Sequence, residues 1–210
     1  LYTDRAISYR VDKGFDHATV ALSVRVQQMV RSDTGSAGVM FTIDTETGFP
    51  DVVLINAAYG LGEMVVKGTV TPDEFYVYKP TLRTGHRPIL RKHLGSKETM
   101  MIYDVGGSRM TRTVPVTYKD RNRFSITDDH VIQLAHWACI IEDHYSSRKG
   151  ATCPMDIEWA LDGRTGELFI VQARPETVQS RTSRDEIRSY QLQEHGQAIV
   201  TGRAIGHRIG

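Results

Sequence analysis

The chain has 210 residues, of which 40% are hydrophobic and 24% are charged, and its formal net charge is +1. This length allows a substantial hydrophobic core, in one large domain or in one and a half smaller ones. The near-neutral charge leaves no broad basic surface, which argues against nucleic acid as a partner.

The cysteines and the hydropathy exclude further classes of protein. Cys139 and Cys153 are the only cysteines and form no CxxC pair, so the chain is not a disulfide scaffold. No apolar run approaches the length of a membrane span and no signal peptide opens the chain, so we expect a cytoplasmic protein with no membrane partner. The chain begins with Leu1 rather than Met and stops inside the strand-like run 206–210. We therefore expect an internal piece of a longer enzyme or a product of proteolysis.

The first half of the chain is predicted to be rich in strands. After a polar lead-in at 1–15, apolar alternation predicts strands at 18–30, 38–44, 52–56 and 73–78. Asp44 is expected to cap the turn that follows the second of them. Residues 88–116 are predicted to form further short strands, interrupted by glycines.

One long amphipathic helix is predicted over residues 127–145. Thr127 is a suitable N-cap, and the acidic pair that follows it favours the positive end of the helix dipole. Apolar residues then recur at helical spacing. The histidines on this helix are expected to be solvated, and no paired metal-binding histidine motif is present.

Residues 156–177 contain the most informative pattern, two alternating runs joined by the turn-forming segment 162–166. This predicts a β-hairpin. On the first strand Asp156, Glu158 and Ala160 share a face. On the second strand the residues expected to share a face are Leu168, Ile170, Gln172 and Arg174.

The register of this hairpin decides whether the polar residues meet. A loop with an odd number of residues, centred on Arg164 or Thr165, places Glu158 opposite Ile170 or Gln172, with Arg174 on the same face. An even loop would turn Gln172 to the other face. Oxygen ligands beside an arginine suit a magnesium ion that bears phosphates. A solvated strand face with no ligand remains the alternative.

A glycine pair at Gly60 and Gly62, followed by Glu63, ends an apolar run. Glycines allow close backbone approach to a ligand, and Glu63 would then face a phosphate-bound metal or a ribose. A plain turn is the alternative. Neither a P-loop nor a dinucleotide-binding glycine motif is present.

The amino-acid sequence around these residues resembles that of a known family. The runs MDIEWA and FIVQARPET, at 155–160 and 169–177, resemble the end of the nucleotide domain of the PEP-utilising ATP-grasp dikinases. Upstream, QMVRS at 28–32, AGVMFT at 37–42, INAAYGLGEMVV at 55–66 and PDEFYV at 72–77 match the same family in order. The resemblance extends through essentially all 210 residues.

The resemblance implies site residues for Mg-ATP. Glu158 and Gln172 would hold Mg2+ and the nucleotide phosphates, and Arg174 would contact phosphate. Glu63 would be a further site residue, and the adenine would lie at a hinge formed by Gln28, Met29 and Val30. The histidine that accepts the phosphoryl group would lie outside this chain, so no catalytic residue is expected within it.

The resemblance also implies an α+β fold with three parts. Residues 1–178 would form part of an ATP-grasp nucleotide-binding domain, chiefly its C-terminal lobe, with a mixed or antiparallel sheet. Residues 179–190 would be a linker, and 191–210 would open a swivelling phosphohistidine domain.

The implied reaction converts pyruvate, ATP and water to phosphoenolpyruvate, AMP and phosphate. Pyruvate would be bound by a domain absent from this chain, and a homodimer formed through the full-length enzyme stays open. The alternatives are a sister dikinase that uses phosphate, rifampicin or glucan as acceptor, or a folded but inert scaffold. Alone, this chain is expected to be inactive.

Overall fold

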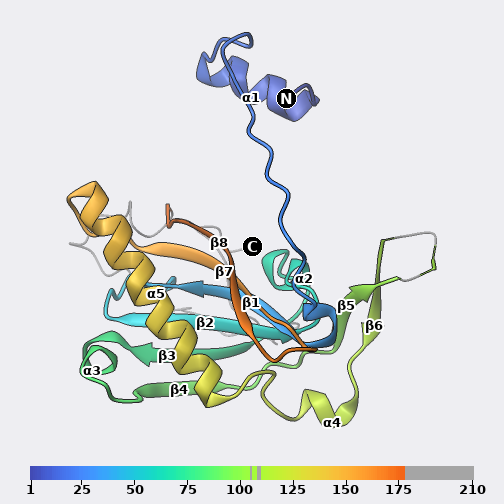
Figure 1. Cartoon of the computed structure of the whole chain (residues 1–210), viewed down its shortest axis with the longest axis vertical. Helices are drawn as coiled ribbons and strands as arrows, with labels where there is room; N and C mark the ends of the chain where they lie inside the picture. The colour runs from blue at the N-terminus through green and yellow to red at the C-terminus, as the bar shows by residue number, and fades with distance from the viewer. Residues whose placement is uncertain (105, 108–109, 178–210) are drawn as a thin grey trace, which may run out of the picture.

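The computed structural model describes residues 1–104, 106–107 and 110–177. The predicted linker at 179–190 and the predicted phosphohistidine segment at 191–210 lie outside the described residues. The described part is an α+β fold built around one six-stranded sheet (Figure 1).

The strands of the large sheet are all antiparallel to their neighbours. Across the sheet, the order is β4 (Ile89–His93), β3 (Asp73–Tyr78), β2 (Val52–Tyr59), β1 (Ser36–Phe41), β7 (Met155–Leu161) and β8 (Leu168–Pro175). A separate two-stranded ribbon pairs β5 (Thr99–Tyr103) with β6 (Thr111–Pro115). The strands predicted at 38–44, 52–56, 73–78 and 88–116 are confirmed, with shifted ends.

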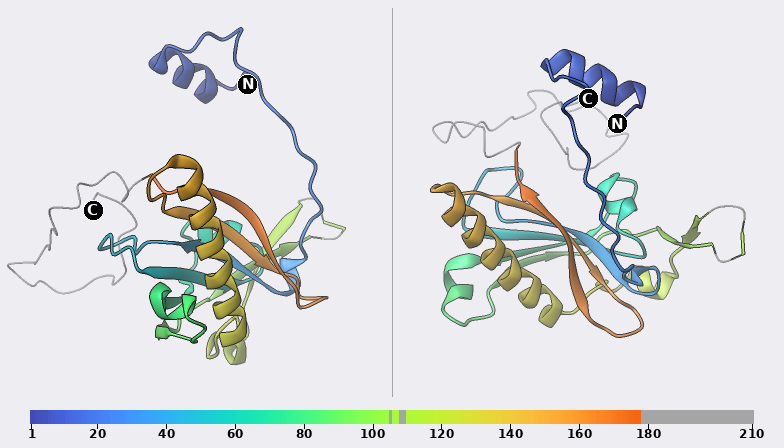
Figure 2. Two further views of the ribbon diagram at one scale, coloured as in Figure 1. Left: turned by 60° about the vertical axis from the view of Figure 1, so that its left-hand side comes forward. Right: turned by 45° about the horizontal axis from the view of Figure 1, so that its top comes forward.

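Helix α5 (Asp128–Lys149) covers one face of this sheet (Figures 1 and 2). Thr127 is its N-cap, as predicted. Thr127 also forms a capping box with His130. Gly150 caps the helix in the left-handed conformation, so the last helical residue, Lys149, lies four residues beyond the predicted end. His136 and His144 are exposed, and His130 is half-buried.

The hydrophobic core lies between α5 and the sheet. Alternate residues of the inner strands β1, β2, β3 and β7 point toward the helix and are buried, such as Ile55, Phe75 and Ile157. The buried side chains of α5 that meet them include Val131, Leu134 and Ala138. The intervening strand residues point to the opposite side, which we call the open face.

The shorter helices were not predicted. They are α1 (Asp4–Lys13), α2 (Glu63–Val66), α3 (Lys79–Arg83), α4 (Tyr118–Arg121) and the 3-10 turn η1 (Ser32–Thr34). Helix α1 begins at the Thr3 N-cap and ends at the Gly14 C-cap, and its apolar side chains Ile7 and Val11 are exposed. The polar lead-in assigned to 1–15 is therefore largely helical.

The strand predicted at 18–30 is wrong. Residues 20–30 form an extended segment between α1 and the sheet, and they pair with no strand in the described part of the chain (Figure 1). Its alternating apolar side chains are exposed, with Val26 at 97%. Alternation specifies the faces of a strand, but a strand also needs a ladder partner.

Candidate functional site

The predicted hairpin forms at one edge of the sheet from β7 and β8. Its register pairs Glu158 with Gln172 and Asp156 with Arg174. Directly opposite side chains in such a pair have Cβ atoms about 4.5–5.5 Å apart. The structure therefore brings Glu158, Gln172 and Arg174 together on the open face, as predicted.

The loop length and the strand pairing that produce this register differ from the prediction. Leu161 pairs with Leu168, so the loop spans residues 162–167, an even number rather than the predicted odd one. A β-bulge then shifts the register between Glu158 and Trp159, and Val171 is the extra residue on β8. An added residue reverses the side-chain alternation, which returns Gln172 to the face of Glu158.

The bulge also corrects the predicted grouping of residues on β8. Leu168 and Ile170 pack against the core beneath α5, whereas Gln172 and Arg174 are exposed on the open face. The prediction that all four share one face is wrong. Trp159 is buried on the core side of β7, as expected for the residue between two open-face positions.

Glu158 and Gln172 are the residues of the hairpin pair that carry side-chain oxygens on the open face. Glu158 is half-buried and Gln172 is exposed at the sheet edge. No cluster of three or more His, Cys, Asp or Glu side chains suitable for a metal occurs among the described residues. The donor set nonetheless fits Mg2+, which commonly takes one or two protein oxygens and completes its shell with phosphates and water.

Arg174 is already paired in this structure, with a partner to which the sequence analysis gave no role. Its Nε and one terminal nitrogen lie 2.8 and 2.7 Å from Oδ2 of Asp156. The arginine side chain is 64% exposed and the aspartate side chain 14% exposed. The guanidinium thus lies at the solvent edge of the face, within reach of a ligand phosphate. Asp156 was identifiable from its alternation with Glu158.

The hairpin residues continue two rows that run across the open face. Val39 pairs with Asn56 on one side and with Glu158 on the other, so one row contains Asn56, Val39, Glu158 and Gln172. The next row contains Leu54, Phe41, Asp156 and Arg174. Apolar side chains therefore line the floor of the face between the polar groups of β2 and those of the hairpin.

Glu63 opens α2, which contacts β1 and β2 at one end of the open face (Figure 2). Gly62 lies against Ala37, the open-face residue of β1 two positions before Val39. The Glu63 carboxylate accepts a hydrogen bond from Lys67 one turn later, and both side chains are exposed. Glu63 therefore lies on the same side of the sheet as Glu158, and its carboxylate is paired with Lys67.

Gly60 has a structural explanation. Its φ is +83°, and a Cβ built at this position would lie 2.5 Å from the carbonyl oxygen of Met101 on β5. Glycine is thus required to pack the ribbon against the end of β2. The turn interpretation accounts for Gly60 without a ligand.

Residues 28–30 enter the sheet domain at the tip of the hairpin. Gln28 and Met29 are exposed and Val30 is half-buried. The next residue, Arg31, donates its backbone N–H to Asp162 (3.1 Å), and its carbonyl oxygen accepts from Gly163 (3.2 Å). Residues 28–30 are therefore tethered to the same hairpin that holds Glu158 and Gln172.

The Arg31 side chain strengthens this junction. Its guanidinium donates two hydrogen bonds of 2.8 Å to Asp33 and lies over the ring of Tyr103. The hydrogen bond from Arg31 holds the pKa of the Asp33 carboxyl below its ordinary value. The pKa of Asp162 is also lowered, first by the backbone N–H of Arg164 and then by that of Arg31. Both carboxylates therefore favour the ionised form that these contacts require.

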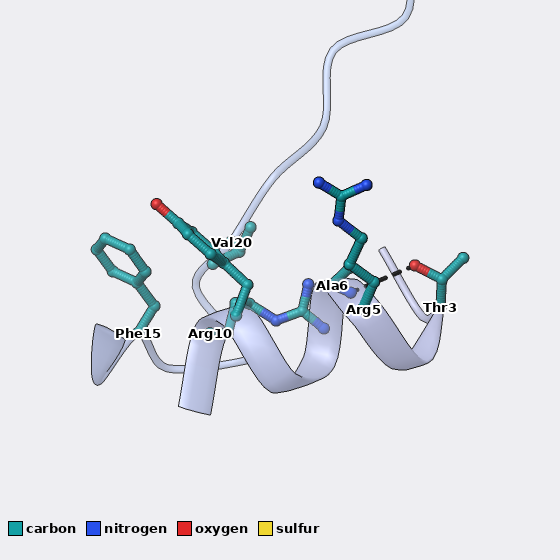
Figure 3. A pocket seen from close by; sticks show the side chains of 7 residues that line it. Thr3, Arg5, Ala6, Arg10, Phe15 and Val20 are labelled. Atoms are coloured by element: carbon teal, nitrogen blue, oxygen red, sulfur yellow. Dashed lines mark hydrogen bonds between the residues drawn. The ribbon is translucent and has the colours of Figure 1, made fainter. Parts of the chain in front are cut away.

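Two hollows in the described part of the chain lie away from the hairpin. One, of about 650 Å³, is formed by α1 and the segment after it (Figure 3). Within it, Arg10 is already engaged by His17 and by the carbonyl oxygen of Leu1. The other, of about 340 Å³, is an apolar groove between α5 and β8. Neither includes the hairpin carboxylates, so the open face is the better candidate.

Comparison with known proteins matches the chain to one family. The model of the family described as "Pyruvate phosphate dikinase, AMP/ATP-binding domain" matches residues 1–195. Proteins named phosphoenolpyruvate synthase from Synechocystis, Pseudomonas aeruginosa and Escherichia coli are 62%, 58% and 54% identical to it. In each case the alignment covers 100% of this chain and 26% of the relative. The chain thus spans about a quarter of the length of these relatives.

Proposed function

The chain belongs to the family of the pyruvate phosphate dikinase AMP/ATP-binding domain, and from that premise we propose that it binds Mg-ATP on the open face of its six-stranded sheet. The observation that supports this most strongly is the pairing of Glu158 with Gln172 beside Arg174. Two oxygen ligands and a guanidinium are the groups that a metal-bound triphosphate requires.

The position of each group suggests how the nucleotide lies. Gln28, Met29 and Val30 reach the sheet at the hairpin tip, and we assign the base to this end. Glu158 and Gln172 lie further along the face, beyond the pair Ala160 and Phe169, and Asp156 and Arg174 are in the next row. A nucleotide laid along the hairpin would therefore pass from base to metal to phosphate in that order. Glu63, on α2, would flank this path.

The side chains would act by binding and by neutralising charge. Bound Mg2+ supplies charge neutralisation for the phosphates during phosphoryl transfer. Glu158 and Gln172 would hold the metal at the edge of the sheet. Arg174 exchanges one or both of its contacts with Asp156 for a phosphate oxygen and so fixes the orientation of the phosphate chain. No residue of this chain is assigned as the phosphoryl acceptor.

For the whole protein we propose the reaction suggested by the names of the relatives. A phosphoenolpyruvate synthase would convert pyruvate, ATP and water to phosphoenolpyruvate, AMP and phosphate. This chain would contribute the C-terminal lobe of an ATP-grasp domain within residues 1–178. Residues 179–190 and 191–210 would form a linker and the start of a phosphohistidine domain. Pyruvate binding and any homodimer would depend on other parts of the protein.

The assignment is tested by Glu158→Ala and Arg174→Ala in the full-length protein. Each substitution removes a group that stabilises charge on the transferring phosphates, so we expect turnover to fall about 100-fold or more. Glu167→Ala, an exposed carboxylate in the loop of the same hairpin, is the matched control. Turnover is measured as AMP formation. Near-normal turnover in both Glu158→Ala and Arg174→Ala would contradict the assignment of these residues to the Mg-ATP site.

A further inference from the structure

The hollow of about 650 Å³ is formed by α1 and the residues that follow this helix (Figure 3). Small-molecule sites in proteins commonly have volumes of about 300–1,000 Å³. The extended segment 20–30 separates this hollow from the large sheet (Figure 1). The hollow is therefore distinct from the open face, and the proposed Mg-ATP site does not account for it.

Two arginines line the hollow. Arg5 is exposed, whereas Arg10 is only 6% exposed. The Nε of Arg10 donates to Nδ1 of His17 (2.8 Å), and one terminal nitrogen donates to the carbonyl oxygen of Leu1 (2.6 Å). Both acceptors are neutral, because an imidazole that accepts a hydrogen bond at one ring nitrogen is in its uncharged form. These contacts satisfy N–H groups of the Arg10 guanidinium and leave its positive charge uncompensated.

A buried charge is unfavourable unless it has a partner of opposite sign. Among the described residues, none that lines the hollow is acidic. Arg5 adds a second guanidinium to the same lining, so the two positive charges face a space without a carboxylate. The hollow therefore favours an anionic ligand.

The spacing of residues along α1 explains the space between the arginines. Ala6 and Arg10 are one turn apart on the helix, and Arg5 and Tyr9 form the neighbouring stripe. All four residues line the hollow. The side chain of Ala6 is a single methyl group, so it leaves room beside the longer side chains around it.

Aromatic and apolar side chains complete the wall of the hollow. They are those of Tyr9, Phe15 and Val20. Figure 3 shows Phe15 and Thr3 toward opposite ends of the hollow, with Arg10 between them. A ligand that fits this lining has an anionic group for the arginines and an apolar or planar body for the aromatic side chains.

We propose that this hollow binds a phosphate monoester that has an apolar or aromatic body. At pH 7 a phosphate monoester carries a charge of about −1.5 to −2, which matches the two guanidiniums. Its oxygens also accept the paired N–H groups that an arginine presents. A carboxylate carries a single negative charge and would leave one arginine uncompensated. The inference is independent of the proposed Mg-ATP site.

The test is calorimetric titration of the full-length protein with phenyl phosphate in magnesium-free buffer, alongside Arg5→Gln. Arg5 is exposed, so its substitution should leave the fold intact. We expect saturable binding of phenyl phosphate to the wild type, weakened about tenfold in Arg5→Gln. Lys13→Gln is the matched control, because it removes a positive charge from α1 at a residue outside the lining. This control should bind phenyl phosphate as the wild type does.

Two further probes and one further variant examine the chemistry and the location. Benzoate and inorganic phosphate should each bind more weakly than phenyl phosphate, because the first has less charge and the second lacks the aromatic body. Ala6→Leu keeps both arginines and fills the space beside them, and leucine is well tolerated in a helix. This variant should also weaken binding of phenyl phosphate. Wild-type affinity in Ala6→Leu would contradict binding in the hollow.

Three other results would overturn the inference. The first is an absence of saturable phenyl phosphate binding by the wild type. The second is an equal loss of affinity in Arg5→Gln and Lys13→Gln, which would indicate only the general charge of α1. The third is a loss confined to Arg174→Ala, which would place phenyl phosphate on the open face. None of these results would affect the proposed Mg-ATP site, which is measured separately with Mg-ATP.

Discussion

Arg31 joins the extended segment to the sheet through both its backbone and its side chain. Its backbone binds Asp162 and Gly163 of the hairpin loop, and its guanidinium binds Asp33. The Asp33 side chain is only 7% exposed, so its charge depends on Arg31 for a partner. The alignment of residues 28–30 with the hairpin therefore depends on an ion pair two residues apart in sequence.

The first prediction concerns Asp33→Asn and pH. Because the pKa of Asp33 is lowered in the folded state, the ion pair stabilises the fold fully above the pKa of the unfolded chain. That contribution is lost as pH falls through the lower pKa of the folded state. Urea unfolding should show the wild type more stable than the variant by about 1–3 kcal/mol at pH 7. The difference should shrink below about pH 4. A difference that is independent of pH would contradict this.

The second prediction concerns the cysteines. Burial raises the pKa of the Cys139 thiol, and both Cys139 and Cys153 are buried and unoxidised. Since the thiolate is the reactive form, a disulfide reagent at pH 8 should label the native protein slowly. Labelling should become fast once denaturant unfolds the chain. Rapid labelling of Cys139 in the native protein would show that the α5 side of the core is open.

At the scale of elements, α5 is fixed to the sheet by a buried ion pair as well as by its apolar face. Lys79 Nζ lies 2.7 and 2.9 Å from the two carboxylate oxygens of Glu142 and also donates to the carbonyl oxygen of Thr42. The two side chains are 7% and 9% exposed. This contact joins α3, α5 and the residue that follows β1, so it orients the helix on the sheet.

The third prediction concerns Glu142, with the neighbouring Asp143 as its control. Glu142→Ala leaves a buried lysine without its counter-charge and should lower the free energy of unfolding by about 3–5 kcal/mol. Asp143→Ala removes an exposed pair with Arg83 and should change it by less than about 1 kcal/mol. Replacing both partners, in Lys79→Met with Glu142→Leu, should recover most of the loss. If urea unfolding showed that Glu142→Ala and Asp143→Ala lower the free energy of unfolding equally, this account would be contradicted.

The hairpin shows how far the sequence determines an element. Turn residues between two alternating runs predicted the hairpin and the meeting of Glu158 with Gln172, and both are confirmed. The bulge at Val171 was not predictable, because a valine fits either face and the alternation of polar residues looks regular. The even loop and the bulge each shift the register by one residue, and together they restore the expected pair.

Other elements show the limits of local patterns. The N-cap and apolar spacing of α5 were sufficient to locate it, because its signals are local. The apolar alternation at 18–30 was not sufficient for a strand, because ladder formation depends on a partner elsewhere. Among site residues, Asp156 was visible by alternation alone. The row that Val39 and Asn56 share with Glu158 was not visible, since only the sheet order places these residues side by side.

At the scale of the whole molecule, the two faces of the sheet have different roles. One is buried by α5 and provides the core, whereas the other has α2 at one end and leaves Gln172 and Arg174 exposed (Figure 2). The segment that leads from α1 joins at the tip of the same hairpin. In the described part of the chain no helix is long and apolar enough to span a bilayer. The open face therefore carries Glu158, Gln172 and Arg174 together at its β7–β8 edge.

The central claim is that the open face at the β7–β8 hairpin is the Mg-ATP site, and calorimetric titration of Gln172→Ala tests it most directly. Gln172 is exposed, so its substitution should leave the fold intact while removing one oxygen ligand. We predict saturable Mg-ATP binding to the wild-type protein, weakened about tenfold or more by Gln172→Ala and unchanged by Glu167→Ala. Equal affinity in the wild type and in Gln172→Ala would contradict the account and place the nucleotide elsewhere.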